Sequence, residues 1–151
     1  MKDLEITNKT WTEESFFEAL TTNCGEAEAN VAKRILIAIN SKIKEFWFGE
    51  GKRGSIVPVF KHGGKEYYPF SLIEDGKIEI YFQWHSKKAP FDKEKKRLEL
   101  LGMLNKIEGV DIAKDKINAR PTIELKLLLN KTEFNKFIDA IKFFFEEIEK
   151  I

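Results

Sequence analysis

A short glycine-rich segment carries the most distinctive chemistry of the chain. Residues 49–54 read Gly-Glu-Gly-Lys-Arg-Gly, which matches the letter pattern G-x-G-x-x-G of nucleotide-binding loops. A dinucleotide-binding fold needs a helix directly after this loop, whereas the sequence here predicts a strand, and the further motifs of a kinase are absent. We therefore expect a hairpin loop that either holds a phosphate oxygen or merely carries solvated charges. The residues of this prediction are Gly49, Gly51, Lys52, Arg53 and Gly54.

The charges of the chain are unevenly distributed although the formal net charge is only +1. Residues 1–30 hold two lysines and seven acids, and residues 31–65 hold eight basic residues and two acids. A local basic surface of this kind either faces a polyanion or offsets the acidic N-terminal segment. We expect Lys87, Lys88 and Arg120 to line the same surface as the glycine-rich loop. The predicted partner is nucleic acid, bound weakly and with little sequence preference, or else a partner protein, including a second copy in a homodimer.

A second candidate for chemistry is the sequence Glu124-Leu125-Lys126 in a predicted strand. An E-x-K pair occurs in metal-dependent nucleases of the restriction-enzyme type, where acids hold the metal and the lysine assists the attacking water. That reaction needs a further acid, and the nearby ones, Asp111 and Asp115, fall in a predicted loop. We therefore expect charges that point outward from an alternating strand rather than a nuclease centre.

Histidine and cysteine residues are too few for a metal cluster. The chain has two histidines, His62 and His85, and a single cysteine, Cys24. We predict no metal, no cofactor and no catalytic triad. Tyr81, Gln83 and His85 are predicted to lie together on the outward face of a strand, where they would contact a ligand.

Hydrophobic periodicity predicts the elements that position these residues. Alternation from Lys77 to Trp84 predicts an interior strand with Ile78, Ile80, Phe82 and Trp84 on its buried face. Further strands are predicted at residues 46–48, 55–60, 67–73 and 122–128. Asp75-Gly76 predicts a two-residue type I′ turn, and His62-Gly63-Gly64 predicts a second hairpin. Pro58 and Pro69 predict edge positions or bulges.

Helical spacing predicts four helices, at about residues 10–22, 26–45, 92–107 and from Asn130 to the C-terminus, with Thr10 and Asn130 as N-caps. Between the third helix and the last strand lies a loop of about a dozen residues, long enough to be functional. The predicted core consists of Ile35, Ile39, Ile78, Ile80, Phe82, Leu101, Ile123, Leu125, Phe137, Ile141 and Phe145.

These elements predict an α+β fold, an antiparallel meander of about five strands with four helices packed mostly on one face. The length of 151 residues suits a single domain spanning residues 1–151, in which residues 1–9 form a flexible arm or a short edge strand. No stretch is apolar enough to cross a membrane or to form a signal region, so we expect a soluble, cytoplasmic protein. Exposed aromatic residues at Trp11, Trp47, Tyr67 or Tyr81 would form an interaction patch.

Residues 48–55 with Pro58, residues 78–84 and Pro90-Phe91 together resemble a small uncharacterised α+β module. This module occurs alone or appended to predicted nuclease and restriction-related proteins, and the resemblance spans about residues 12–150. Its shared motifs are structural, and it offers no catalytic residues to carry over. The resemblance implies a non-catalytic accessory or binding role associated with nucleic acid.

Overall fold

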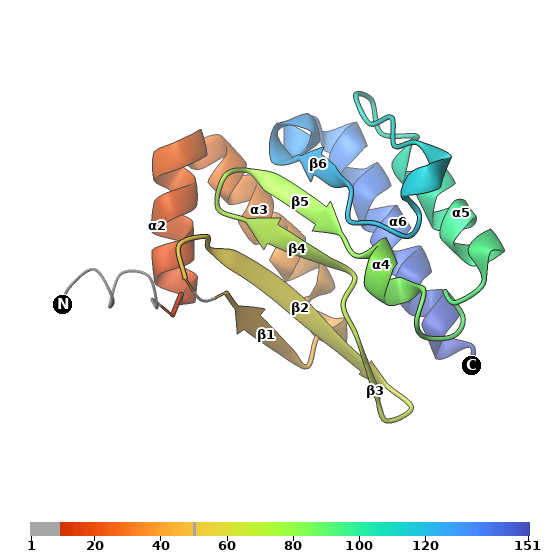
Figure 1. Ribbon diagram of the computed structural model, residues 1–151. Helices are drawn as coiled ribbons and strands as arrows, with labels where there is room; N and C mark the ends of the chain where they lie inside the picture. Colours follow the sequence, from red (N-terminus) through yellow and green to blue (C-terminus); the bar gives the residue numbers. More distant parts are fainter. Residues whose placement is uncertain (1–9, 50) are drawn as a thin grey trace.

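The computed structural model describes residues 10–49 and 51–151. The predicted arm at residues 1–9 lies outside the described residues, as does Glu50. Helices cover one face of an antiparallel sheet, as the α+β prediction required (Figure 1). The strands are β1 (Glu45–Phe48), β2 (Ser55–His62), β3 (Lys65–Tyr67), β4 (Phe70–Ile73), β5 (Lys77–Ile80) and β6 (Thr122–Glu124).

The sheet runs in the order β1-β2-β4-β5-β6, and β3 extends the far end of β2 as a short hairpin. Every pairing is antiparallel. Strand β5 lies between β4 and β6, which confirms its predicted interior position. The chain therefore builds most of the sheet from a meander of neighbouring strands and adds the distant segment β6 at one edge.

The two predicted hairpin turns have different outcomes. Residues 63–64 form a two-residue turn with φ angles of 60° and 78°, as a type I′ turn requires. The prediction for Asp75-Gly76 is wrong, because Ile73 pairs with Lys77 and leaves a three-residue loop. Among the described residues only glycines have positive φ, so Asp75 does not occupy the first central position of a type I′ turn and Gly76 alone, at 91°, takes the left-handed conformation.

Proline interrupts the sheet where the sequence suggested a bulge. The predicted strand 67–73 is split by Pro69 into β3 and β4. Between the two ladders, residues 68–71 face the three residues 57–59 of β2, so one extra residue bulges out. Pro58 lies opposite this bulge and is paired only on its other side, with Phe46 of β1.

Two predicted strands are shorter than expected and continue as helical turns. The strand predicted over residues 77–84 ends at Ile80, and α4 (Phe82–His85) follows. The strand predicted over residues 122–128 ends at Glu124, and the 3-10 helix η3 (Leu125–Leu129) follows. In the second segment Leu125 and Leu128 are three residues apart, so a tight helical turn buries both of them.

The helices are α2 (Glu13–Cys24), α3 (Glu26–Ile39), α5 (Glu94–Leu104) and α6 (Lys131–Glu149), with 3-10 turns η1 (Asn40–Lys42) and η2 (Lys114–Lys116). The predicted cap Thr10 is wrong by two residues, because Thr12 caps α2 and forms a capping box with Ser15. Asn130 caps α6 as predicted, accepting from the backbone of Thr132 and Glu133. Helix α3 is shorter than predicted, because the chain enters β1 at Glu45.

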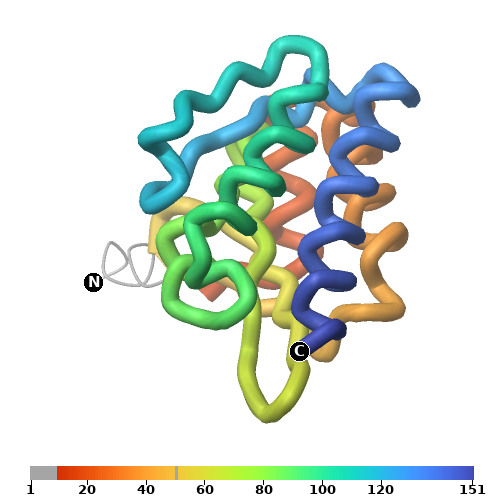
Figure 2. Tube along the Cα trace, turned by 90° about the vertical axis from the view of Figure 1, so that its right-hand side faces the viewer, coloured from red at the N-terminus to blue at the C-terminus, as the bar shows by residue number. Residues whose placement is uncertain are grey.

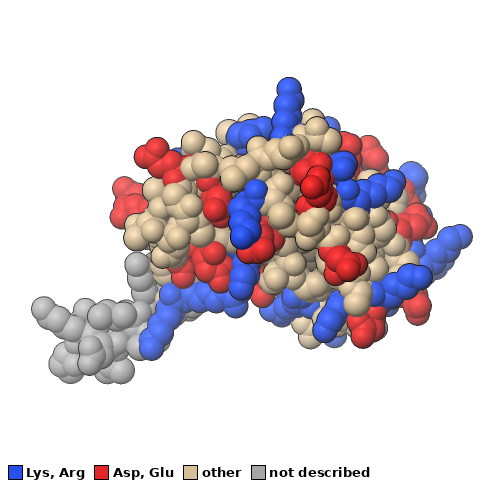
Figure 3. All heavy atoms as spheres, turned by 90° about the horizontal axis from the view of Figure 1, so that it is seen from above, with Lys and Arg blue, Asp and Glu red and all other residues tan. Residues whose placement is uncertain are grey.

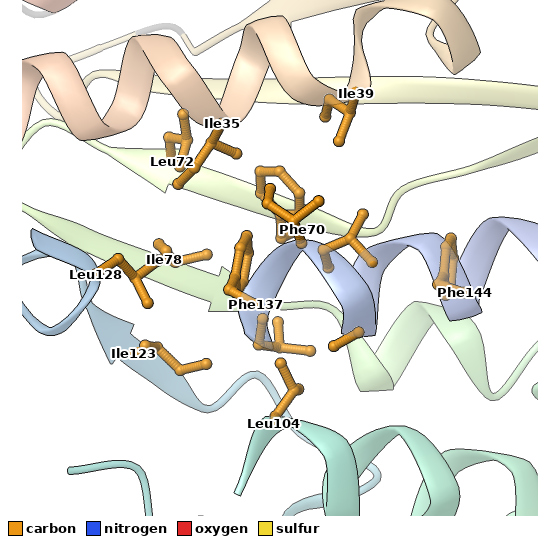
Figure 4. Close-up of a cluster of buried hydrophobic side chains, with 14 of the residues drawn as sticks. Ile35, Ile39, Phe70, Leu72, Ile78, Leu104, Ile123, Leu128, Phe137 and Phe144 are labelled. Atoms are coloured by element: carbon orange, nitrogen blue, oxygen red, sulfur yellow. The ribbon is translucent and has the colours of Figure 1, made fainter. Parts of the chain in front are cut away.

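The core lies between the sheet and the helix layer. Figure 4 shows side chains from α3, β4, β5, β6, α5 and α6 converging on one another. All eleven residues of the predicted core are buried. Seen from the side, α5 and α6 run next to each other, and the segment between α5 and β6 passes over the end of the molecule (Figure 2). No helix of the described residues has the length and apolar character needed to cross a membrane.

Candidate functional site

The glycine-rich loop joins β1 to β2 and packs around the side chain of Trp11. The indole Nε1 of Trp11 donates to the carbonyl of Gly51 at 2.9 Å, and its backbone N–H donates to the carbonyl of Gly49 at 3.1 Å. A Cβ at Gly54 would lie 2.8 Å from the Trp11 ring, closer than two carbon atoms can approach. The glycines therefore allow a close contact with Trp11, and the N–H of Gly49 is already donated to the carbonyl of Ser55.

The cations of this loop lie at the margin of the sheet face that points away from α3 and α6. We call this the outer face. Lys52 and Arg53 are both exposed, and the Arg53 guanidinium lies 3.4 Å from the carboxylate of Glu79. Glu79 alternates with the buried Ile78 and Ile80 of β5, so it points to the outer face. Arg53 is thereby brought over the outer face.

A row of ring contacts crosses the outer face. It consists of Trp47, Tyr68, Trp84 and Tyr81, which we call the aromatic row. The ring centroids are 5.0 Å apart for Trp47 and Tyr68, 4.9 Å for Tyr68 and Trp84, and 4.6 Å for Trp84 and Tyr81. These separations are those of favourable offset or edge contacts between aromatic rings. Trp47 is 40% exposed, Tyr68 and Trp84 are half-buried, and Tyr81 is the buried end of the row.

The row is assembled by local backbone features of three separate segments. Trp47 lies between Phe46 and Phe48, whose side chains face the helix layer, so its own side chain faces outward. Tyr68 occupies the bulge next to Pro69. Trp84 reaches the outer face because the chain turns into α4 directly after β5, which overturns its predicted place on the buried face.

Two cations lie over the rings of the row. The Arg120 guanidinium lies 5.0 Å from the centroids of both Tyr81 and Trp84, and its Nε donates to the side-chain oxygen of Gln83 at 2.8 Å. The Lys88 ammonium lies 5.3 Å from the ring of Tyr68 and donates to the backbone carbonyl of Glu66. Such cation–π contacts hold the charges against the rings while leaving further N–H donors for a ligand.

A buried arginine that the sequence did not single out anchors the residues just before Arg120. Arg97 of α5 is only 6% exposed, and its guanidinium donates to the carbonyl of Ile117 at 2.9 Å, the carbonyl of Phe91 at 2.8 Å and the side-chain oxygen of Asn118 at 2.9 Å. In the sequence Arg97 is one of several cations at the start of α5 and does not stand out from them. In the structure it ties Ile117 and Asn118, which lie just before Arg120, to α5.

The tyrosines of the row stay protonated at neutral pH. Burial, with a hydrogen bond donated to the Glu66 carboxylate at 3.0 Å, raises the pKa of Tyr68 to about 12. Burial also raises the pKa of Tyr81, while the nearby positive charges of Arg120 and Arg53 lower it. Arg53 contacts Glu79 and Arg120 lies over the rings of Tyr81 and Trp84, so the loop cation and Arg120 lie on the same side of the sheet.

The prediction that Tyr81, Gln83 and His85 share an outward strand face is wrong. These residues belong to the turn into α4, where Gln83 is exposed and Tyr81 and His85 are buried. His85 packs against the rings of Phe91 and Phe144, and its Nε2 lies 2.9 Å from the carbonyl of Tyr68. Burial lowers the pKa of His85 to about 4, against the effect of its hydrogen bond to that carbonyl. His85 is therefore part of the core.

The E-x-K pair does not lie along one strand. Glu124 is the last residue of β6, Lys126 belongs to η3, and their charged atoms lie 3.7 Å apart. Asp115 lies in η2. Across residues 10–49 and 51–151, no three His, Cys, Asp or Glu side chains are grouped so that they could hold a metal ion. Glu124 and Lys126 are best described as an exposed ion pair.

Basic and acidic side chains are interspersed over the face of the molecule seen in Figure 3. The outer face itself is marked by the local combination of Arg53, Arg120 and Lys88 with half-buried aromatic rings.

Fold and site together define an α+β protein whose open antiparallel sheet is covered by helices on one side and by an aromatic and cationic surface on the other. Comparison with protein families, curated proteins and solved structures gives no match for this chain. Of the predicted site residues, the structure brings Arg53, Arg120 and Lys88 to the outer face. Trp84 and Tyr68 were missed as site residues, although the run Tyr67-Tyr68-Pro69 marks a break in alternation where a ring can leave the sheet plane.

Proposed function

We propose that this protein is a non-catalytic binding module that holds single-stranded nucleic acid on its outer face. One observation supports the proposal above all, the unbroken row of ring contacts from Trp47 to Tyr81 with Arg120 and Lys88 over its rings. Proteins that bind single strands without sequence preference combine aromatic rings, on which bases stack, with cations that follow the backbone. Bases within a duplex are stacked on one another and cannot reach such rings.

The direct test is a titration of a fluorescently labelled oligonucleotide, single-stranded or duplex, at about 50 and 200 mM salt. We expect the single strand to bind more tightly, with an affinity that falls steeply as salt increases. Each neutralised phosphate of a single strand contributes about 0.7 to the slope of log K against log salt, so three cations predict a slope near −2. Absence of binding at about 50 mM salt and micromolar protein would refute the proposal.

Two pairs of variants separate the contribution of the rings from that of the charges. Trp47→Ala should weaken binding by about 1–3 kcal/mol, the cost of losing one stacked base, whereas Ile37→Ala should have no effect. Ile37 is a matched control because it is 74% exposed and lies in the helix layer. Arg120→Ala should reduce the salt slope by about 0.7, and Lys142→Ala, an exposed cation of α6, should leave it unchanged. The double variant of Lys52 and Arg53 tests the loop in the same way.

The second candidate function, association with a protein partner or a second copy, is favoured by a different surface. An apolar hollow of about 480 Å³ is lined by Phe17, Leu36, Ile37, Phe46 and Phe48, where α2 and α3 meet β1. If this hollow mediates self-association, size-exclusion chromatography at two protein concentrations will show a shift that Ile37→Asp abolishes. The patch predicted from Trp11, Tyr67 and Tyr81 is not available for this role, because all three are buried.

A further inference from the structure

Next to the aromatic row, the outer face is hollowed in two adjoining places. One hollow, of about 200 Å³, is lined by Tyr67, Trp84, His85 and Lys87, and the other, of about 480 Å³, by Lys61, Gly64 and Lys65. Both are also lined by Glu66, Tyr68 and Lys88, so the two hollows adjoin each other. We call the two together the lysine hollow. The smaller part alone, at about 200 Å³, is large enough for a phosphate group.

The charges of the lysine hollow converge on Glu66. The Lys61 ammonium lies 3.4 Å from one carboxylate oxygen of Glu66, and the Tyr68 hydroxyl donates to the other at 3.0 Å. Lys88 donates to the backbone carbonyl of the same residue. The Glu66 carboxylate is thus an internal anion held by groups that would also bind the oxygens of a phosphate.

The positive charge of the hollow exceeds what its own carboxylates neutralise. Four lysines, at positions 61, 65, 87 and 88, line it, against Glu66 and a second acid, Glu45, which lies 3.8 Å from Lys61. The excess is therefore two positive charges. A phosphate monoester carries about −1.5 to −2 at pH 7, whereas a phosphodiester within a strand carries a single negative charge. The charge balance favours the monoester.

We propose that the lysine hollow binds a phosphomonoester whose attached base stacks on Trp84 and Tyr68, so that the ligand is a nucleotide with a terminal phosphate. The inference rests on the proposed function of the aromatic row, which supplies the stacking surface. A terminal phosphate of a strand and a free mononucleotide share this chemistry. Both present a dianion next to a base, and the half-buried rings of Trp84 and Tyr68 border the hollow that takes the dianion.

The test compares one oligonucleotide sequence with a 5′-phosphate, a 3′-phosphate or no terminal phosphate, each carrying its fluorescent label at an internal position. We expect at least one phosphorylated form to bind about tenfold more tightly than the unphosphorylated form, the effect of one further charge-assisted hydrogen bond. Competition with AMP and with adenosine identifies the source of the ligand. Displacement of the bound strand by AMP but not by adenosine supports a free nucleotide as the ligand. A persistent preference for phosphorylated strands, without displacement by AMP, supports a strand end.

Two variants of the lysine hollow are expected to change the affinity for a phosphorylated strand in opposite directions. Lys87→Ala, at an exposed position, should remove most of the preference for the terminal phosphate, and Lys142→Ala should not. Glu66→Gln removes the competing charge but keeps an oxygen that accepts from Tyr68, so it should increase affinity for the phosphorylated strand and leave the unphosphorylated strand unchanged. A loss of folding cannot mimic that gain.

Two different results would refute the phosphomonoester site and the proposed function. Equal affinity for phosphorylated and unphosphorylated strands would refute the lysine hollow as a phosphomonoester site and leave the proposed function intact. Failure of every strand to bind would refute both.

Discussion

The buried imidazole of His85 makes a sharp prediction about stability and pH. His85 is 3% exposed, and burial lowers its pKa from the ordinary 6.5 to about 4. Below pH 6.5 the unfolded chain takes up a proton on this residue, while the native protein does not until about pH 4. The stabilising contribution of the neutral imidazole is therefore fully present above pH 6.5 and is lost as the pH falls towards 4.

The size of this effect follows from the difference between the two pKa values. Each unit of difference corresponds to 1.36 kcal/mol, so the free energy of unfolding should fall by about 3 kcal/mol between pH 7 and pH 4. Hydrogen bonds from Glu108 and Lys150 lower the pKa values of Glu133 and Glu147, respectively. Stability from those two carboxylates is present above their ordinary pKa of 4.5 and is lost only below it, so the interval from pH 6.5 to 5 isolates His85.

Urea denaturation followed by far-UV circular dichroism at pH 7.5, 6.5, 5.5 and 5.0 measures the prediction. His85→Gln should be less stable at pH 7.5, because it loses ring contacts, but its stability should vary much less over this interval. His62→Gln is the matched control, since His62 lies at the β2–β3 turn and its substitution should leave the slope unchanged. A wild-type slope equal to that of His85→Gln would refute the reasoning.

Two further predictions concern packing and the buried arginine. Gly54→Ala should destabilise the protein by about 1–3 kcal/mol, because the new Cβ would lie 2.8 Å from the Trp11 ring. Gly102→Ala, which adds a Cβ in open space in α5, should instead stabilise the protein by about 0.5–1 kcal/mol. Thermal melts of both variants measure these changes in stability. Arg97→Met should cost on the order of 2–5 kcal/mol, because it leaves the carbonyls of Phe91 and Ile117 without their donors. Urea denaturation that finds Arg97→Met as stable as wild type would contradict that account.

Features set by local backbone chemistry could be predicted from the sequence. Gly63-Gly64 forms the two-residue turn because both glycines take positive φ, and Asn130 caps α6 because its side chain reaches the first free N–H groups. The core could also be predicted, because residues such as Ile35 and Phe137 repeat at helical spacing and point to one side. These predictions need only the neighbours of each residue along the chain.

The ends of β5 and β6 could not be predicted in this way. Phe82 continues the alternation of Ile78 and Ile80 and is fully buried, so the pattern contains no sign that the strand has ended. After Ile80 the chain turns into α4, where the N–H of Gln83 donates to the carbonyl of Ala119 in the distant segment before β6. Tertiary contacts therefore decide where a helical turn replaces a strand that has the same apolar residues.

The outer face was least accessible to sequence reasoning, because its groups come from segments that only the fold brings together. Trp47 belongs to β1, Tyr68 to the bulge before β4, and Trp84 to α4, and each alone looks like an ordinary aromatic residue. The residues just before Arg120 are hydrogen-bonded to the buried Arg97, which in the sequence is one of several cations close together. Arg97→Lys keeps the charge but loses the forked geometry, and we expect it to weaken oligonucleotide binding as much as Arg120→Ala while the protein remains folded. That result would show that Arg97 positions Arg120. Unchanged binding would show that Arg120 is held by Gln83 and the rings alone.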